Sequence, residues 1–316
     1  MLSRVAESIY WMSRYLERAQ NIARLIDVHG QLVLDQPRVN PQDHWAALLH
    51  ASCNYDAFLE SHPTPGPESA FHFLAFDSEH TGSMLNCISY ARENARGVRE
   101  ILSGEFWEQI NALYHEVNDA STKDASSAQL QHECFFSRVK ALGLSFEGIV
   151  NGTMSQQEEA LWFRIGQLLE RADQTSRILD VKYFVLLPSS EDVGTPLDQI
   201  QWSGLLRSIS ALQVYRSEYG AITPANVVEL LVLGRRFPRA ILYCVTEADA
   251  ALRQILGTQA GFFRNEAEQL LGQLTSELNY QTVDNVLANG LHEYIDRFQN
   301  LLTDVGEAVH STYFTH

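Results

Sequence analysis

Apolar residues recur at three- and four-residue spacing along positions 2–28, which is the period of an α-helix. Seven of them fall on one arc: Val5, Ile9, Met12, Leu16, Ala19, Ala23 and Ile26. A stripe of this kind is typical of a helix that packs on a hydrophobic core. The pattern predicts a long amphipathic helix from Leu2 to about Val28, with Gly30 as a cap or a kink.

The opposite arc of this helix differs from an ordinary solvated face. It contains no lysine and carries Glu7, Tyr10, Trp11, Arg14, Glu17, Arg18 and Asn21. Large aromatic rings between guanidinium and carboxylate groups indicate a face that is covered or lines a cleft. One interpretation is an ion-paired network between packed helices. The other is a polar cleft for an anionic or zwitterionic ligand, or for a charged segment of a partner.

The central string of the helix occurs a second time. Leu16-Glu17-Arg18-Ala19 returns as Leu169-Glu170-Arg171-Ala172, and at the same offset Arg24 and Asp27 match Arg177 and Asp180. This repetition predicts two pseudo-symmetric helical halves, 1–152 and 153–316, each led by a long Glu-Arg-Ala helix. The two Glu-Arg pairs are then expected to meet near the centre. Convergence of two amphipathic patterns is the alternative.

The remaining periodicity is helical as well. Nothing alternates with period two over any length, so the predicted fold class is all-α, a helical bundle. Loops are expected at about 36–42, 62–67, 119–127 and 188–196, which are rich in proline or small polar residues. Helices are expected at about 43–51, 54–60, 68–76, 83–102, 104–118, 128–152, 156–184, 197–216, 224–233, 237–257, 261–279 and 284–313, with Pro238 in a first turn.

Three arginines lie on nearly one line of the helix expected at 83–102. Arg92, Arg96 and Arg99 follow its apolar stripe, and like charges at this spacing repel unless something negative faces them. Acidic side chains on a neighbouring helix would satisfy them. An anionic ligand is the other interpretation.

Charge excludes some classes of function. The chain has 316 residues, 45% of them hydrophobic, and a formal net charge of −16. This composition is that of a globular protein, and the charge disfavours binding to nucleic acids or to anionic membrane surfaces. No signal-peptide pattern and no apolar run of membrane-spanning length is visible, so we expect a cytoplasmic protein.

Known catalytic and metal-binding patterns do not occur. The four cysteines form no CxxC pair, the histidines show no ligand spacing, and neither a phosphate-binding nor a nucleophile motif is found, so no metal and no cofactor is predicted. Glu17 and Glu170 would form an acid/base pair if they met, but adjacent arginines favour two ionised carboxylates and hence an electrostatic or structural role.

Several of these stretches together resemble the bacterial alpha-E domain family. The resemblance rests on residues 2–7 (LSRVAE), 10–19 (YWMSRYLERA), 91–96 (ARENAR), Ser103, Trp107 and 169–172 (LERA), and it covers essentially the whole chain as a single domain, 1–316. Gln20 departs from the family, in which a glutamate is expected after Glu-Arg-Ala.

The resemblance implies an all-helical cytoplasmic protein whose biochemistry is poorly defined. Family members are typically encoded beside a circularly permuted ATP-grasp ligase-like protein and a transglutaminase-like protein, and some also beside a proteasome-related protease. This context implies a role in making, modifying or removing a peptide or amide linkage, with those two proteins as partners.

Two functional hypotheses follow. In the first, the chain is an accessory or interaction component of the ligation system and has no turnover of its own. In the second, it is an enzyme or small-molecule binder for an amino-acid or peptide substrate of that system. A purely structural scaffold is a third interpretation. The candidate ligand- or partner-binding residues, which could also form a buried ion network, are Glu7, Tyr10, Trp11, Arg14, Glu17, Arg18, Arg92, Glu93, Arg96, Glu170, Arg171 and Arg177.

Overall fold

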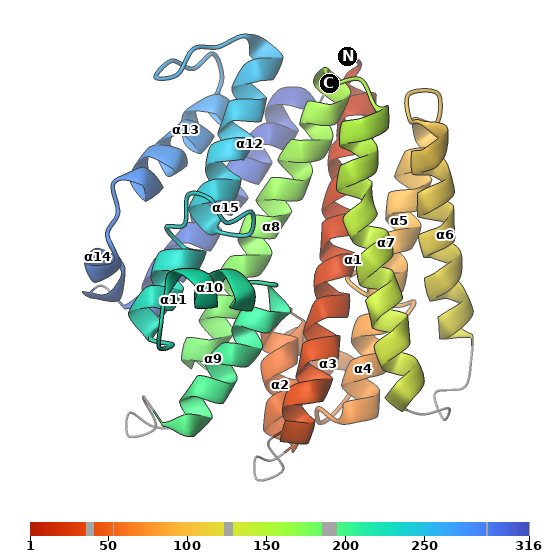
Figure 1. Cartoon of the computed structure of the whole chain (residues 1–316). Helices are drawn as coiled ribbons and strands as arrows, with labels where there is room; N and C mark the ends of the chain where they lie inside the picture. Colours follow the sequence, from red (N-terminus) through yellow and green to blue (C-terminus); the bar gives the residue numbers. More distant parts are fainter. Residues whose placement is uncertain (36–40, 53, 123–128, 185–194, 289, 316) are drawn as a thin grey trace. The chain divides into compact units, whose positions relative to one another are not determined.

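A computed structural model describes residues 1–35, 41–52, 54–122, 129–184, 195–288 and 290–315 (Figure 1). All regular elements in these ranges are helices, which confirms the predicted all-α class. They are α1 (Ser3–Asp35), α2 (Pro41–Ala51), α3 (Tyr55–Ser61), α4 (Pro67–Ala75), α5 (Met84–Gly97), α6 (Gly104–Ser121), α7 (Gln129–Thr153), α8 (Glu158–Phe184), α9 (Pro196–Ser208), α10 (Leu212–Glu218), α11 (Pro224–Leu231), α12 (Ile241–Leu256), α13 (Glu266–Asn279), α14 (Val283–Ala288) and α15 (Leu291–Tyr313).

The chain forms two compact units. Unit 1 comprises Met1–Gln167 and unit 2 comprises Leu168–His316, so the boundary falls inside α8. Each unit is described below by itself. The predicted halves 1–152 and 153–316, and their pseudo-symmetry, remain a prediction.

Unit 1 is built around α1. This helix packs against α5 and α7, and both of these pack against α6, so that the four long helices lie side by side (Figure 1). All seven residues of the predicted apolar stripe are buried, with Ile9, Met12 and Ala23 fully so. Ser83 and Ser103 begin α5 and α6, because their hydroxyls accept hydrogen bonds from the backbone N–H groups of Asn86 and Phe106.

Unit 2 is centred on α13, which packs against α12 and α15. Asn265 begins α13 by accepting a hydrogen bond from the backbone N–H of Glu268, and its amide also donates to the Tyr313 hydroxyl near the end of α15. Smaller pairs, α9 with α10 and α11 with α14, complete the unit. Within the described residues, no helix combines the length and the apolarity that crossing a bilayer requires.

Two predicted helix ends were wrong. The first helix continues through Gly30 to Asp35, beyond the expected end near Val28, so Gly30 does not cap it, and a kink at Gly30 stays a prediction. The helix that begins after Ser83 ends at Gly97 rather than near Leu102, and Val98 leaves helical geometry. Arg99 therefore lies in the turn that leads to α6, although its apolar neighbours keep a helix-like spacing.

Two predicted helices are each divided by a residue with positive φ. The helix expected at 197–216 breaks at Ser210 (φ 58°), between α9 and α10, and the one expected at 284–313 breaks at Gly290 (φ 86°), between α14 and α15. L-residues other than glycine rarely adopt this left-handed region, so Ser210 carries local strain.

The helices expected at 237–257 and 261–279 begin several residues later than predicted. Pro238 lies in the turn before α12 rather than in its first turn. Residues 257–264 form a loop that uses positive φ at Gly257 and Gly261. Much of the loops predicted at 36–42, 119–127 and 188–196 lies outside the described residues.

Candidate functional site

The predicted site residues divide into three groups in the structure. Glu7, Tyr10, Trp11, Arg14, Glu17 and Arg18 lie on α1, and Arg92, Glu93 and Arg96 lie on α5, all in unit 1. Glu170, Arg171 and Arg177 lie on the part of α8 that belongs to unit 2. The expected meeting of the two Glu-Arg pairs therefore concerns two separate units and stays a prediction.

The polar face of α1 is covered along part of its width. Tyr10, Glu17 and Asn21 are each 1% exposed, whereas Trp11 and Arg18 keep intermediate exposure. The face is thus neither fully solvated nor fully buried, and whether it lines a cleft, as its aromatic and charged composition indicated, stays a prediction.

A strip of alternating rings and guanidinium groups runs over the accessible part of this face. The Arg14 guanidinium lies 5.2 Å from the Trp11 ring centroid, and the Trp11 and Tyr15 rings are 5.8 Å apart. The strip crosses to α5, where the Tyr90 ring lies 5.4 Å from that of Tyr15. Arg18 approaches Tyr15 at 6.0 Å. We call Trp11, Arg14, Tyr15, Arg18 and Tyr90 the α1–α5 surface.

Partial burial affects the chemistry of this strip. Burial raises the pKa of Tyr15, and the nearby Arg18 guanidinium acts in the opposite direction. The phenol therefore stays protonated at neutral pH and can donate a hydrogen bond. Tyr90, at 38% exposure, is one of the large hydrophobic side chains that the fold leaves accessible.

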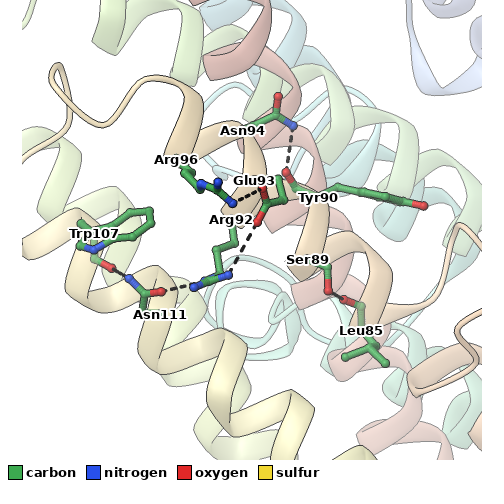
Figure 2. Close-up of polar contacts among 9 residues, drawn as sticks. All are labelled: Leu85, Ser89, Tyr90, Arg92, Glu93, Asn94, Arg96, Trp107 and Asn111. Atoms are coloured by element: carbon green, nitrogen blue, oxygen red, sulfur yellow. Dashed lines mark hydrogen bonds and ion pairs between the residues drawn. The ribbon is translucent and has the colours of Figure 1, made fainter.

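The arginines of α5 face away from this strip. Figure 2 shows Tyr90 and Arg92 leaving α5 on opposite sides, as two positions about 200° apart on a helix must. Arg92 Nε donates to Asn111 Oδ1 of α6 at 2.7 Å, and its guanidinium lies 4.6 Å from the Tyr114 ring centroid. Asn111 is itself held by a bond from Nδ2 to the Trp107 carbonyl oxygen (Figure 2).

The other two arginines complete what we call the α5–α6 arginine cluster. Arg96 Nη1 lies 3.2 Å from Glu93 Oε2, and the Arg99 guanidinium lies 5.3 Å from the Trp107 ring centroid. The expectation that acidic side chains of a neighbouring helix face these arginines was wrong for the described residues. Rings and an amide face the arginines from α6, and the one carboxylate paired with them is on α5 itself.

Sequence reasoning missed the contribution of α6. Arg99 and Trp107 had been noticed, but Asn111 and Tyr114 were not candidates. Trp107, Asn111 and Tyr114 are spaced four and three residues apart, which places them on one face of a helix. That spacing could have identified, from the sequence, a face of α6 able to contact the arginines.

The Glu-Arg pair of unit 2 is buried and holds a turn. Glu170 is fully buried and accepts a hydrogen bond from Gln174 Nε2 at 3.1 Å. Arg171, at 5% exposure, donates from Nη1 to the Pro238 carbonyl at 3.4 Å. Thr175 Oγ1 donates to the next carbonyl, that of Arg239, at 2.9 Å. This part of α8 therefore fixes the backbone of the segment before α12.

The repeated aspartates each contact a basic side chain on another helix of their own unit. Asp27 Oδ2 lies 2.5 Å from Lys140 Nζ of α7, and Asp180 Oδ1 lies 2.7 Å from His292 Nδ1 of α15. Arg177, the third candidate of unit 2, pairs with Asp173 one turn earlier at 2.8 Å. The two aspartate contacts join α1 to α7 and α8 to α15.

The His292–Asp180 contact predicts a pH dependence of the stability of unit 2. The hydrogen bond to Asp180 raises the pKa of His292 above its ordinary value of 6.5, while partial burial opposes this. Below pH 6.5, protonated His292 makes its full contribution to the stability of unit 2. This contribution is lost as pH rises through the raised pKa.

Denaturant midpoints recorded from below pH 6.5 to alkaline pH, for the unmodified chain and for His292→Gln, measure the effect. The difference between the two should shrink at alkaline pH. His50 and His80 have lowered pKa values through burial and belong to unit 1, so they are common to both proteins and cancel. A difference that does not change with pH would contradict the assignment.

A second feature missed from sequence is the loop 257–264. Phe262 and Phe263 are 67% and 57% exposed, although the loop backbone is held by the Arg253 guanidinium, which donates to the carbonyls of Gln259 and Phe262. The helical pattern had assigned residues 261–263 to a helix, and so these rings were not singled out.

Comparison with known proteins places these observations in a family. Residues 1–314 match Alpha-E, described as a predicted alpha-helical domain with a conserved ER motif. The sequence contains two Glu-Arg dipeptides, 17–18 and 170–171, one in each unit.

The curated relatives are longer proteins. An uncharacterized protein of Mycobacterium bovis and two of Mycobacterium tuberculosis are each 22% identical over 332 residues, which cover 98% of this chain but 36% of theirs. The chain thus spans about a third of the length of these relatives. No solved structure matches it significantly. The match over residues 1–314 shows that the chain belongs to the Alpha-E family.

Proposed function

We propose that this chain is the accessory, interaction component of an ATP-grasp-associated system that forms, modifies or removes peptide or amide linkages. Its partners in this proposal are an ATP-grasp ligase-like protein and a transglutaminase-like protein, as the family resemblance implies. The chain binds and positions, and the partner supplies the chemistry.

The observation that carries the proposal is the α1–α5 surface. Tryptophan, tyrosine and arginine are the residues that dominate the binding energy of protein interfaces, and here they form one continuous strip that is partly exposed on α1 and exposed at Tyr90. The rings and guanidinium groups already contact one another, so little side-chain entropy is lost when a partner covers them. The greater length of the relatives also supports the proposal, because their matched region is joined to a further, larger part of the chain.

The proposal is tested with purified proteins from the native host. The tagged chain should retain the ATP-grasp ligase-like protein, and ATP-dependent ligation by that protein should change when the chain is added. Turnover of an amino-acid or peptide substrate by this chain alone would contradict the accessory role and favour the alternative, an enzyme acting in the same system.

Trp11→Ala should weaken the complex by roughly 30-fold, because truncation of a central interface tryptophan costs about 2 kcal/mol. Surface plasmon resonance with the ligase-like protein measures the dissociation constant. Tyr280→Ala is the matched control, since this ring is 85% exposed and belongs to unit 2. Equal losses in both variants, or none in either, would reject the α1–α5 surface as the interface.

Arg18→Ala separates binding from a structural role. In an interface role it lowers affinity with little change in the thermal midpoint. In a structural role its loss would remove contacts within unit 1, such as the approach of its guanidinium to the Tyr15 ring, and would lower the thermal midpoint whether or not a partner is present. A melt recorded beside each binding curve distinguishes the two.

A further inference from the structure

The α5–α6 arginine cluster has features that a protein interface does not require. Arg92 is oriented before any ligand arrives, since its Nε donates a hydrogen bond to Asn111 and its guanidinium carbon lies over the Tyr114 ring, 4.6 Å from the centroid. A guanidinium fixed in this way loses little further entropy on binding an anion, and its remaining N–H donors keep their fork geometry.

Two guanidinium groups share one indole ring. Arg92 and Arg99 lie 5.9 Å and 5.3 Å from the Trp107 centroid, and Arg96 lies between them in the sequence, one turn of α5 after Arg92. The side chain of Arg92 is 28% exposed and that of Arg96 is 70% exposed, so donors of both reach solvent. Each of the two positive charges on Trp107 is stabilised by a cation–π contact with that ring.

The charge of the cluster is not balanced locally. Within the described part of the chain, Glu93 is the one carboxylate within ion-pair distance of these three arginines. Glu100, Glu105 and Glu108 are close in sequence but form no ion pair with them there. Three positive charges against one negative charge leave an excess of two, on a chain whose formal net charge is −16.

We propose that the α5–α6 arginine cluster binds the dianionic phosphoryl group of a soluble ligand. A phosphoryl group carries up to two negative charges at neutral pH and offers three acceptor oxygens, which matches the excess charge and the several free donors. A single carboxylate would leave one positive charge uncompensated. The site lies on the side of α5 opposite to Tyr90, so it goes beyond the proposed partner interface and does not depend on it.

Isothermal titration calorimetry on the full chain provides the test, with pyrophosphate, inorganic phosphate and the dicarboxylate glutarate as probes. We expect saturable binding of pyrophosphate, weaker binding of phosphate, and much weaker binding of glutarate. Added salt should reduce the affinity. Arg96→Gln and Arg99→Gln should each weaken pyrophosphate binding by roughly tenfold, the range for one charge-assisted hydrogen bond.

Two further variants make the result specific. Arg92→Lys keeps the charge but loses the fork and the stacking on Tyr114, so it should also weaken binding. Arg297→Gln is the matched control, because Arg297 is 67% exposed, is paired with a single glutamate and lies in unit 2. Thermal melts confirm that each variant is folded.

Four outcomes would overturn the proposal. The first is no heat from pyrophosphate at about 10 mM, well above a millimolar dissociation constant. The second is binding that Arg297→Gln weakens as much as Arg96→Gln does. The third is equal or tighter binding of glutarate or of a polyglutamate peptide, which would identify an acidic-peptide site. Co-sedimentation with phosphatidic acid vesicles without binding of soluble pyrophosphate would likewise exclude a soluble ligand.

Discussion

Replacing Gly166 by alanine is expected to destabilise unit 1 by about 3 kcal/mol, at the upper end of the usual cost of overpacking. Gly166 lies on α8 directly against α1, and a Cβ atom there would meet Ser13 Oγ and the Tyr10 carbonyl oxygen closer than side chains approach in real structures. Ser13 Oγ is itself bonded to the Tyr10 carbonyl at 2.8 Å. Because a carbonyl in a helix cannot rotate away, the two helices must separate.

Gly148→Ala is the matched control for this prediction. Gly148 lies on α7, also in unit 1, and a Cβ there would meet nothing within 4 Å. Alanine should therefore stabilise α7 by roughly 0.5–1 kcal/mol, the ordinary gain for a helical glycine. Urea unfolding followed by circular dichroism measures both. A Gly166→Ala protein as stable as the unmodified chain would mean that α1 and α8 do not approach so closely.

Arg253→Ala is expected to destabilise unit 2 by about 3 kcal/mol, the cost of breaking a buried ion pair. Arg253 Nε lies 2.8 Å from Asp249 Oδ2, and the two side chains are only 13% and 14% exposed. The same guanidinium donates to the carbonyls of Gln259 and Phe262. Within the described residues the second carboxylate oxygen of Asp249 has no hydrogen-bond partner, so truncation of Arg253 leaves a buried carboxylate uncompensated.

Hydrogen exchange locates this effect. Amides of the loop 257–264 should exchange faster in Arg253→Ala, because the two bonds that hold the loop backbone are lost. Arg297→Ala serves as the control in the same unit, since its pair with Glu277 is exposed and should contribute less than about 1 kcal/mol. Similar losses in the two variants would show that the Arg253 contacts are not the source of stability.

The helical class and the core side of α1 were predictable from local spacing alone. Burial of Ile9, Met12 and Leu16 follows directly from their recurrence every three to four residues. The rings and arginines of the opposite face indicated that it is not an ordinary solvated face, and Tyr10 and Glu17 on it are buried. These features are local, and each depends only on which residues share one face of one helix.

Helix ends were less predictable. The apolar spacing continues across Ser210 and across Gly290, yet the helices break there. The spacing also continues beyond Gly97, where α5 ends. A turn keeps apolar residues facing the core without keeping the helix, so periodicity does not distinguish the two. The turn at Pro238 depends on such a non-local contact, because its carbonyl oxygen accepts a hydrogen bond from Arg171 of α8, a helix far away in the sequence.

By itself, the sequence determined an all-helical chain, the buried stripe of its first helix, the two Glu-Arg dipeptides, and a line of arginines that needed something to face them. The tertiary structure decided what faces them: an amide and two rings of α6, together with Glu93 of α5 itself, rather than carboxylates of a neighbouring helix. It also decided that Gly166 marks a close approach of two helices and that Phe262 and Phe263 remain exposed. The physical reason is that helical periodicity fixes which residues share a face, whereas the partner of that face is set by packing between segments far apart in the chain.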